Sequence, residues 1–410
     1  MSLLDKIAHL ESLFAIHEPE IHAFVPEEGR FDRLRHEAIA LEKKYSSPDH
    51  RPPLFGVLTG VKDIFHVEGF PTRAGSQLPP EMLTGPEGPA VARLKTAGAL
   101  IVGKTVTTEF AYFAPGPTRN PHDLQHTPGG SSSGSAVGCL WLCEITLGTQ
   151  TIGSVNRPAA FCGVTGFKPS YDRISRIGVI PLSPAVDHVG LFSVGVEGVE
   201  KAAKVIIEDW SAQENLPKPV LGIPEGAYLT HAEPEGLAHF RKTVDRLASA
   251  GFAIQSLPIL PDFEDICQRH HLIVAYEAAR VHEKWFAEYS SLYHPKTAEL
   301  IQRGQQISAI QYQISLDGCE KLRRELMACM ETQGIHLWLS PSAPGPAPRG
   351  LESTGNPVMN LPWTHAGLPT LTLPAGKNAQ GLPLGLQLTA GWYADLQLLT
   401  CAKLLEPLLA

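Results

Sequence analysis

Gly129-Gly-Ser-Ser-Ser-Gly-Ser135 and Gly148-Thr-Gln-Thr-Ile-Gly-Ser154 are two glycine- and serine-rich turns around which the rest of this chain is organised. They flank a short apolar segment, Ala136 to Leu147, which predicts one buried helix. Each turn offers a candidate serine, Ser131 in the first and Ser154 in the second. A helix followed by a loop that folds back would bring both hydroxyl groups into one pocket.

A serine hydroxyl is a poor nucleophile unless a base removes its proton. No histidine occurs between residues 129 and 168, so the usual base is missing from this stretch. Lysine can serve when burial or a neighbouring charge favours its neutral form. The candidate is Lys62, which follows an apolar run, Leu54 to Val61, that predicts a strand. The residues alone therefore suggest two serines and one lysine as a catalytic set.

The motifs around these residues resemble those of the amidase signature family of serine hydrolases, and most closely its malonamidase-like branch. The resemblance covers residues 55–194 and resumes over residues 341–387. The motifs are Gly-Val-Lys62-Asp, Gly-Gly-Ser131-Ser, Gly-Ser154-Val-Asn-Arg-Pro-Ala-Ala-Phe-Cys-Gly and Gly-Phe-Lys168-Pro.

The resemblance implies a Ser–Ser–Lys triad with Ser154 as nucleophile, Ser131 as a bridging serine held by a cis peptide bond, and Lys62 as base. It implies an amidase that cleaves a carboxamide C–N bond through an acyl-serine intermediate, releases ammonia or an amine, and needs no cofactor. The oxyanion hole would be formed by the backbone N–H groups of Thr151, Ile152, Gly153 and Ser154. Each such donor can lower the barrier by roughly 3 kcal/mol.

Two positions depart from the family pattern, because Gln150 stands where an aspartate is usual and Ile152 where a glycine is usual. We expect the substrate to contact Gly130, Ser132, Gln150 and Arg157. In the malonamidase-like branch, the arginine at the place of Arg157 contacts a substrate carboxylate. The alternative role for Arg157 is an ion pair that holds the loop.

Other interpretations of the same residues remain open. Gly130-Ser-Ser-Ser-Gly134 weakly matches a Gly-x-Ser-x-Gly nucleophile elbow, which would make Ser132 the nucleophile. A urea- or carbamate-type hydrolase would use the same triad. A glutaminase subunit of a tRNA-dependent amidotransferase and a non-catalytic scaffold are two further alternatives. Gln150, Ile152 and the short chain disfavour the glutaminase subunit, and retention of the triad residues disfavours the scaffold.

The motifs are spread over most of the 410 residues, so we expect one domain over residues 1–410. Its predicted class is α/β, with a mixed, largely parallel central sheet covered by helices on both faces, because strand and helix patterns alternate between residues 90 and 110. Residues 232–335 form a helix-rich stretch in which amidase signature enzymes differ most. We expect this stretch to line the substrate mouth.

The formal net charge of −8 disfavours a nucleic-acid or anionic-membrane partner. The seven cysteines and the histidines show no metal-ligand spacing, so we expect no metal. The first residues show no signal-peptide pattern and no apolar run reaches 18 residues, so we expect a cytoplasmic protein without a membrane partner. The expected partner is a small-molecule amide, and the malonamidase resemblance suggests a homodimer.

Overall fold

The computed structural model describes residues 2–210 and 218–409. Its centre is one ten-stranded sheet in the order β2-β1-β3-β5-β4-β9-β10-β8-β6-β7. The strands are β1 (Leu58–Lys62), β2 (Leu100–Thr105), β3 (Ile145–Gln150), β4 (Thr165–Lys168), β5 (His188–Ser193), β6 (Leu221–Glu225), β7 (Ile254–Pro258), β8 (Leu337–Pro341), β9 (Thr370–Lys377) and β10 (Pro383–Thr389).

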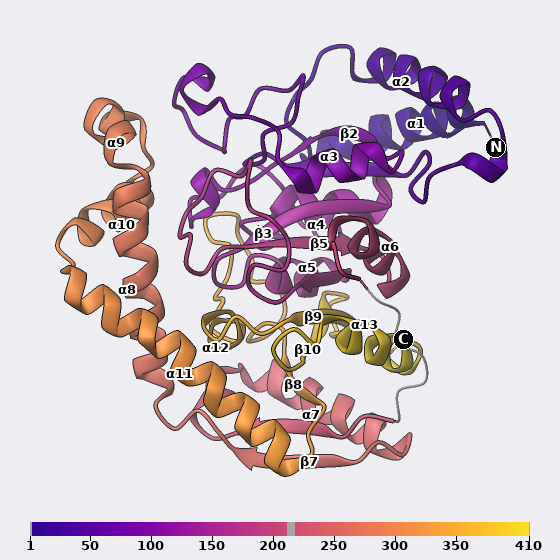
Figure 1. Cartoon of the computed structure of the whole chain (residues 1–410). Coiled ribbons are helices and arrows are strands. Elements are labelled where there is room, and N and C mark those ends of the chain that lie inside the picture. The colour runs from indigo at the N-terminus through magenta and orange to yellow at the C-terminus, as the bar shows by residue number, and fades with distance from the viewer. Residues whose placement is uncertain (1, 211–217, 410) are drawn as a thin grey trace.

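Thirteen α-helices of the described residues surround this sheet and cover both of its faces (Figure 1). They are α1 (Leu3–Ile21), α2 (Arg30–Lys44), α3 (Pro89–Thr96), α4 (Ser133–Trp141), α5 (Asn156–Cys162), α6 (Val196–Ile206), α7 (Pro234–Ser249), α8 (Phe263–Val281), α9 (Glu283–Tyr289), α10 (Pro295–Gln305), α11 (Ala309–Gln333), α12 (Leu361–His365) and α13 (Asp395–Leu405). The predicted class, one large α/β domain with a mixed sheet, is confirmed.

Parallel pairing is concentrated at the two ends of the sheet. β1 pairs in parallel with β2 and β3, and β6 pairs in parallel with β7 and β8. The four strands in between, β5, β4, β9 and β10, make only antiparallel pairs, with one another and with β3 and β8. Parallel neighbours need a crossover helix, whereas β9 and β10 are joined by a short turn that only antiparallel strands allow. The alternation of strand and helix patterns near β1 and β2 therefore holds locally and does not extend to the centre.

The apolar segment between the two serine turns is not one helix. Helix α4 ends at Trp141 and strand β3 begins at Ile145, so the predicted helix over residues 136–147 is wrong in its second half. A short apolar run can be a buried helix or a buried strand, and its pattern cannot separate the two. Ser131 and Ser154 still reach one cavity, because α4 begins two residues after Ser131, at Ser133, and α5 begins two residues after Ser154, at Asn156.

Residues 232–335 are helix-rich, as predicted, and Figure 1 shows α8 to α11 along one side of the molecule. The same stretch also contributes β7 to the edge of the sheet. Two of its helices, α8 and α9, meet at His282. The role of this stretch at a substrate mouth stays a prediction.

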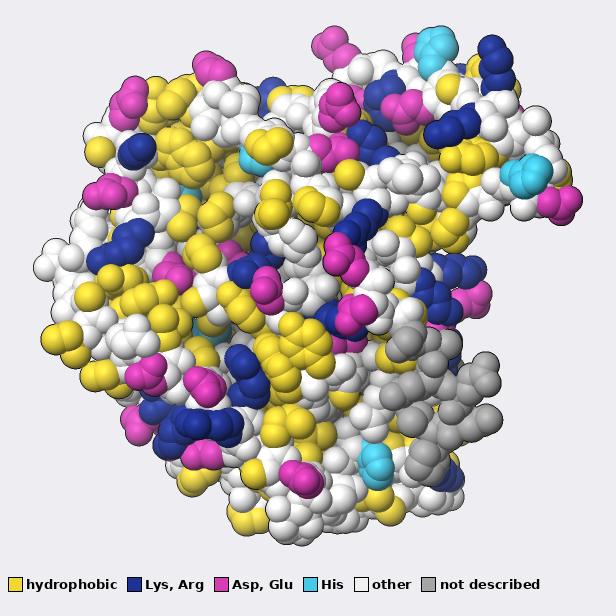
Figure 2. All heavy atoms as spheres, viewed as in Figure 1, with side chains coloured by type: hydrophobic (Ala, Val, Ile, Leu, Met, Phe, Trp, Pro, Cys, Tyr) yellow, Lys and Arg dark blue, Asp and Glu magenta, His cyan; other side chains and the backbone are white. Residues whose placement is uncertain are grey.

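The opposite edge strand, β2, is covered by the N-terminal helices. Arg33 of α2 donates from Nη1 to the carbonyl oxygen of Ile101 at 2.9 Å and from Nη2 to that of Val102 at 3.2 Å. These bonds occupy edge carbonyls that would otherwise be free to pair with another strand. Charged side chains of both signs are interspersed on the face in Figure 2. No helix of residues 2–210 and 218–409 is long and apolar enough to cross a membrane.

Candidate active site

Lys62 is the last residue of β1, and its side chain is fully buried. Its Nζ lies 2.7 Å from Ser131 Oγ, 2.8 Å from Thr149 Oγ1 and 3.0 Å from Ser132 Oγ. Burial lowers the pKa of this amine well below its ordinary value, and the Asp187 carboxylate acts in the opposite direction. The surroundings therefore favour the neutral amine that a base requires.

Ser132 is fully buried, and its hydroxyl is committed to the protein. It donates its single proton to the carbonyl oxygen of Thr149 at 3.1 Å and accepts the Thr149 N–H at 3.2 Å. Its remaining contact, to Lys62, must then be an N–H donated by the lysine. This geometry leaves Ser132 no free proton for a substrate contact, and none of its three bonds leads to Ser154.

Ser131 and Ser154 line one small cavity, together with residues of the turn between β3 and α5. The peptide bond between Gly130 and Ser131 is cis, as the resemblance implies. Ser154 is 7% exposed and lies two residues before the start of α5. The structure thus joins Lys62 to Ser131 by a hydrogen bond and brings Ser131 and Ser154 to the same cavity.

The turn of residues 151–154 lines this cavity. Within the described residues, the N–H groups of Ile152, Gly153 and Ser154 donate no hydrogen bond to the protein. A side chain at Gly153 would place its Cβ 2.3 Å from Asn360 Oδ1, so only glycine fits there. Ile152 has no positive φ, so a β-branched residue is tolerated in place of the usual glycine.

Gln150, expected to contact substrate, is fully buried behind the turn. Its Oε1 accepts the N–H groups of Val155 at 2.7 Å and Asn156 at 3.0 Å. Its Nε2 donates to Thr364 Oγ1 at 3.0 Å. All three bonds go to the protein, so the side chain links β3, the first residues of α5 and α12.

Arg157 also lines the small cavity and is 1% exposed. Its Nη1 donates to the carbonyl oxygen of Gly355 at 2.7 Å, and its Nη2 donates to that of Gly130 at 2.7 Å and to Thr354 Oγ1 at 3.1 Å. Its buried Nε has no partner among the described residues. Burial lowers the pKa of the guanidinium to about 9. The ion pair offered as its structural alternative is absent from the described residues, because every partner is neutral.

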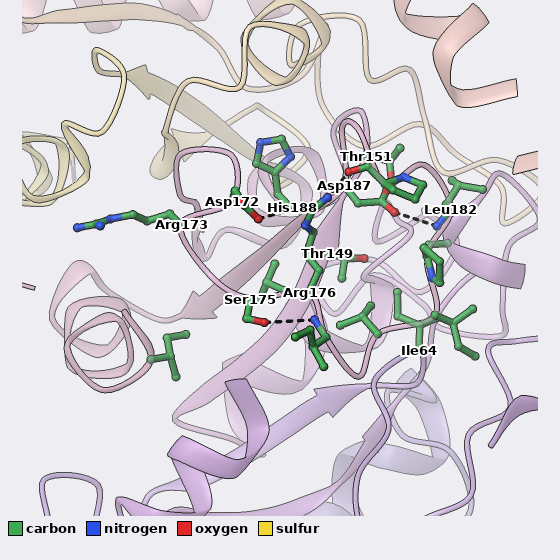
Figure 3. Close-up of a pocket in the computed structure, with 18 of the residues that line it drawn as sticks. Ile64, Thr149, Thr151, Asp172, Arg173, Ser175, Arg176, Leu182, Asp187 and His188 are labelled. Carbon is green, nitrogen blue, oxygen red and sulfur yellow. Dashed lines mark hydrogen bonds and ion pairs between the residues drawn. The ribbon is translucent and has the colours of Figure 1, made fainter. Parts of the chain in front are cut away.

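A larger cavity of about 610 Å³ lies beside the small one and shares Ala111, Thr151 and Leu182 with it. Figure 3 shows Asp187 between Thr151 and Leu182 at this shared wall. Asp187 accepts the Thr151 hydroxyl at 2.6 Å and the Leu182 N–H at 2.9 Å. Burial raises the pKa of its carboxyl group.

Four further residues of the site were not among the predicted site residues, although Thr149 lies inside the second serine turn and the loop Asp187-His-Val-Gly190 resembles loops that support the site in this family. Thr149 contacts Lys62, Asp187 acts on its charge, and Thr364 and His270 contact the turn. The motif spacing pointed to the triad, but Thr364 and His270 lie more than a hundred residues from the turn, so only the fold brings them there. Among the described residues, no group of three or more His, Cys, Asp or Glu could hold a metal ion.

The family model described as Amidase matches residues 15–399. The chain belongs to the amidase family. It is 31% identical to one subunit of the glutamyl-tRNA(Gln) amidotransferase of Synechococcus sp. (strain RCC307), over 94% of this chain and 90% of that protein. A crystal structure of an amidase is 31% identical with a TM-score of 0.91 and covers 100% of this chain and 97% of that chain. A chain from the structure of a vestigial protein complex, which bears on the origins of an s-triazine catabolic enzyme, is 26% identical to this one with a TM-score of 0.88. The match covers 99% of this chain and 95% of that chain. The resemblance to the amidase signature family is confirmed, and the malonamidase-like branch stays a prediction.

Proposed function

We propose that this amidase-family protein is a serine hydrolase that cleaves a small carboxamide through an acyl-Ser154 intermediate. The observation that carries the proposal is the buried Lys62, hydrogen-bonded to Ser131, beside the cavity that Ser131 shares with Ser154. A neutral amine in this position can remove a proton that an isolated serine would keep.

In the proposed reaction, Ser154 Oγ attacks the carbonyl carbon while its proton passes to Ser131 and the Ser131 proton passes to Lys62. The carbonyl oxygen becomes an oxyanion beside the N–H groups of Ile152, Gly153 and Ser154 and that of Thr151. When the C–N bond breaks, the proton held by Lys62 returns through Ser131 to the leaving nitrogen. Water then attacks the acyl group by the same proton path and releases the acid.

The substrate we favour carries a carboxylate close to its amide group. Arg157 lines the cavity as a buried cation, its hydrogen-bond partners among the described residues are all neutral, and its Nε has none. Burying a charge without a counter-charge is costly, and a substrate carboxylate would offset that cost. The bonds of Arg157 to three backbone or hydroxyl oxygens would keep the guanidinium in place before substrate arrives.

The test is ammonia release from matched amides, malonamate with its carboxylate and the neutral propionamide, by wild-type protein and by Ser154→Ala and Arg157→Met. Ser154→Ala should abolish both reactions. Arg157→Met should reduce kcat/KM for malonamate at least about tenfold more than for propionamide, because only malonamate loses a charge partner. Equal losses on both amides would overturn the carboxylate assignment. Aryl amides, carbamates and ureas in the same assay would reveal the urea- or carbamate-type alternative.

A glutaminase subunit is the second candidate, because the curated relatives of this chain include the Synechococcus glutamyl-tRNA(Gln) amidotransferase protein. Both candidates use the same triad, so the discriminating measurement is the need for another protein. We expect the purified chain to hydrolyse its amide alone. Glutamine hydrolysis that appears only after co-purification with a second subunit would favour the glutaminase. Light scattering on the purified chain tests the homodimer, which stays a prediction.

A further inference from the structure

Three consecutive peptide groups link Thr151, Ile152, Gly153 and Ser154, and the carbonyl oxygen of each is within hydrogen-bond distance of another group of the protein. The Thr151 carbonyl oxygen lies 3.0 Å from His270 Nε2, the Ile152 carbonyl accepts the Thr364 hydroxyl at 2.7 Å, and the Gly153 carbonyl accepts the Arg157 N–H at 3.0 Å. A peptide unit is planar, so fixing a carbonyl also fixes the direction of the N–H on its other side. Those N–H groups belong to Ile152, Gly153 and Ser154, the donors of the proposed oxyanion hole.

Thr364 holds the middle peptide, and its hydroxyl has only one proton to give. Three groups compete around its Oγ1: Gln150 Nε2 at 3.0 Å, the Ile152 carbonyl at 2.7 Å and the Asn360 carbonyl at 3.1 Å. The direction of the proton therefore depends on whether the group at position 150 donates or accepts.

The orientation of the Gln150 amide is unambiguous. Its oxygen end faces two N–H donors, Val155 and Asn156, so its nitrogen end must face Thr364. Because this nitrogen donates, Thr364 accepts from Gln150 and keeps its own proton for the nearer carbonyl, that of Ile152. A carboxylate at position 150 would instead accept the Thr364 proton, which would leave two oxygen atoms facing each other at the Ile152 carbonyl.

We infer that Gln150 and Thr364 are positioning residues, which act through the Ile152 carbonyl to aim the Gly153 N–H at the developing oxyanion. This inference rests on the proposed function, because it assigns the turn to an oxyanion hole. It assigns Gln150 a place behind the turn, with no contact to substrate. The amide of Gln150 donates to Thr364 and so leaves the Thr364 proton free for the Ile152 carbonyl. The aspartate that is usual at this position in the amidase signature could not donate in this way.

The test measures the second-order rate of inactivation by an alkyl fluorophosphonate, whose phosphoryl oxygen would occupy the oxyanion hole, for Gln150→Glu, Thr364→Val and Thr364→Ser. Malonamate kinetics and thermal stability are measured in parallel. We expect Gln150→Glu and Thr364→Val to react about 10 to 100 times more slowly than wild type, with kcat reduced and KM nearly unchanged. Thr364→Ser should stay within about threefold of wild type, because it keeps the hydroxyl.

The midpoint of the acid limb of the pH profile should stay unchanged in Thr364→Val and Thr364→Ser, because the Lys62 hydrogen bonds are untouched and neither variant adds a charge. Wild-type rates in both Gln150→Glu and Thr364→Val would overturn the inference. So would equal losses in Thr364→Ser and Thr364→Val, since the hydroxyl would then not be the operative group. A wild-type protein that is inert to the fluorophosphonate and to every amide would overturn the proposed function itself, which separates the two failures.

Discussion

At the scale of single residues, the proposed reaction depends on the charge of Lys62. Burial lowers the pKa of this amine, and the proposed reaction needs the neutral form, so we expect activity to be retained above that pKa and lost as the pH falls through it. The buried Asp187 carboxylate acts against burial and raises the same pKa. The pH at which activity falls on the acid side therefore depends on both the burial of Lys62 and the charge of Asp187.

Replacing Asp187 by asparagine removes this charge while keeping an oxygen for the N–H groups of Leu182 and Ser183. The pKa of Lys62 should then fall further, so we expect the acid limb of kcat/KM to move to lower pH. The measurement is a pH profile of amide hydrolysis for wild type and Asp187→Asn. An acid limb that stays in place or moves upward would contradict the electrostatic coupling.

Replacing Ser131 by alanine should lower kcat much more than replacing its neighbour Ser132. Ser131→Ala removes the proposed proton carrier, and proton transfer by a positioned group contributes typically 10²–10⁴-fold. Ser132→Ala removes an acceptor of Lys62 but no transferred proton, so its loss in kcat should be at least about tenfold smaller. Comparison of kcat for the two variants tests this order. A larger loss in Ser132→Ala would favour the elbow interpretation of Gly130-Ser-Ser-Ser-Gly134.

At the scale of elements, a buried ion pair joins the end of β1 to β2. Lys104 Nζ lies 2.8 Å from Asp63 Oδ1, and the two side chains are 3% and 2% exposed. Lys104→Met would leave the Asp63 carboxylate buried without its counter-charge. We expect this variant to lower the free energy of unfolding by about 3–5 kcal/mol in denaturant titration.

The matched control for this stability measurement is Lys201→Met. Lys201 pairs with Glu197 on the surface of α6 at 2.9 Å, where the side chains are 57% and 78% exposed. Exposed pairs contribute roughly 0–1 kcal/mol, so this variant should stay close to wild type. A similar loss of unfolding free energy in both variants would show that the buried pair contributes no more to stability than the exposed pair.

Elements with a clear period or a clear boundary were predicted well from the sequence. The apolar run from Leu54 to Val61 predicts a strand, and β1 spans Leu58–Lys62; the stretch over residues 232–335 is helix-rich, as predicted. The apolar segment over residues 136–147 was misassigned because a buried helix and a buried strand share the same composition there. From Ile145 the segment pairs with β1 and β5, which lie elsewhere in the sequence, so no local pattern reveals the change from helix to strand.

At the scale of the whole molecule, the motifs identified the family and the class of the sheet but not the packing around the site. The antiparallel centre of the sheet depends on strand partners far apart in sequence, such as β4 with β9. The contacts of Thr364 and His270 with the turn arise in the same way. Local sequence therefore predicted which groups could react, and the fold determined which groups hold them.

The central claim is that Lys62, acting through Ser131, makes Ser154 the nucleophile. The most direct measurement is the mass of the protein after reaction with a fluorophosphonate, followed by mapping of the modified peptide and by the rate of modification. We expect one adduct on Ser154, no adduct in Ser154→Ala, and a rate at least about 100-fold slower in Lys62→Met. An adduct on Ser132, or unchanged labelling of Ser154→Ala or Lys62→Met, would contradict the claim.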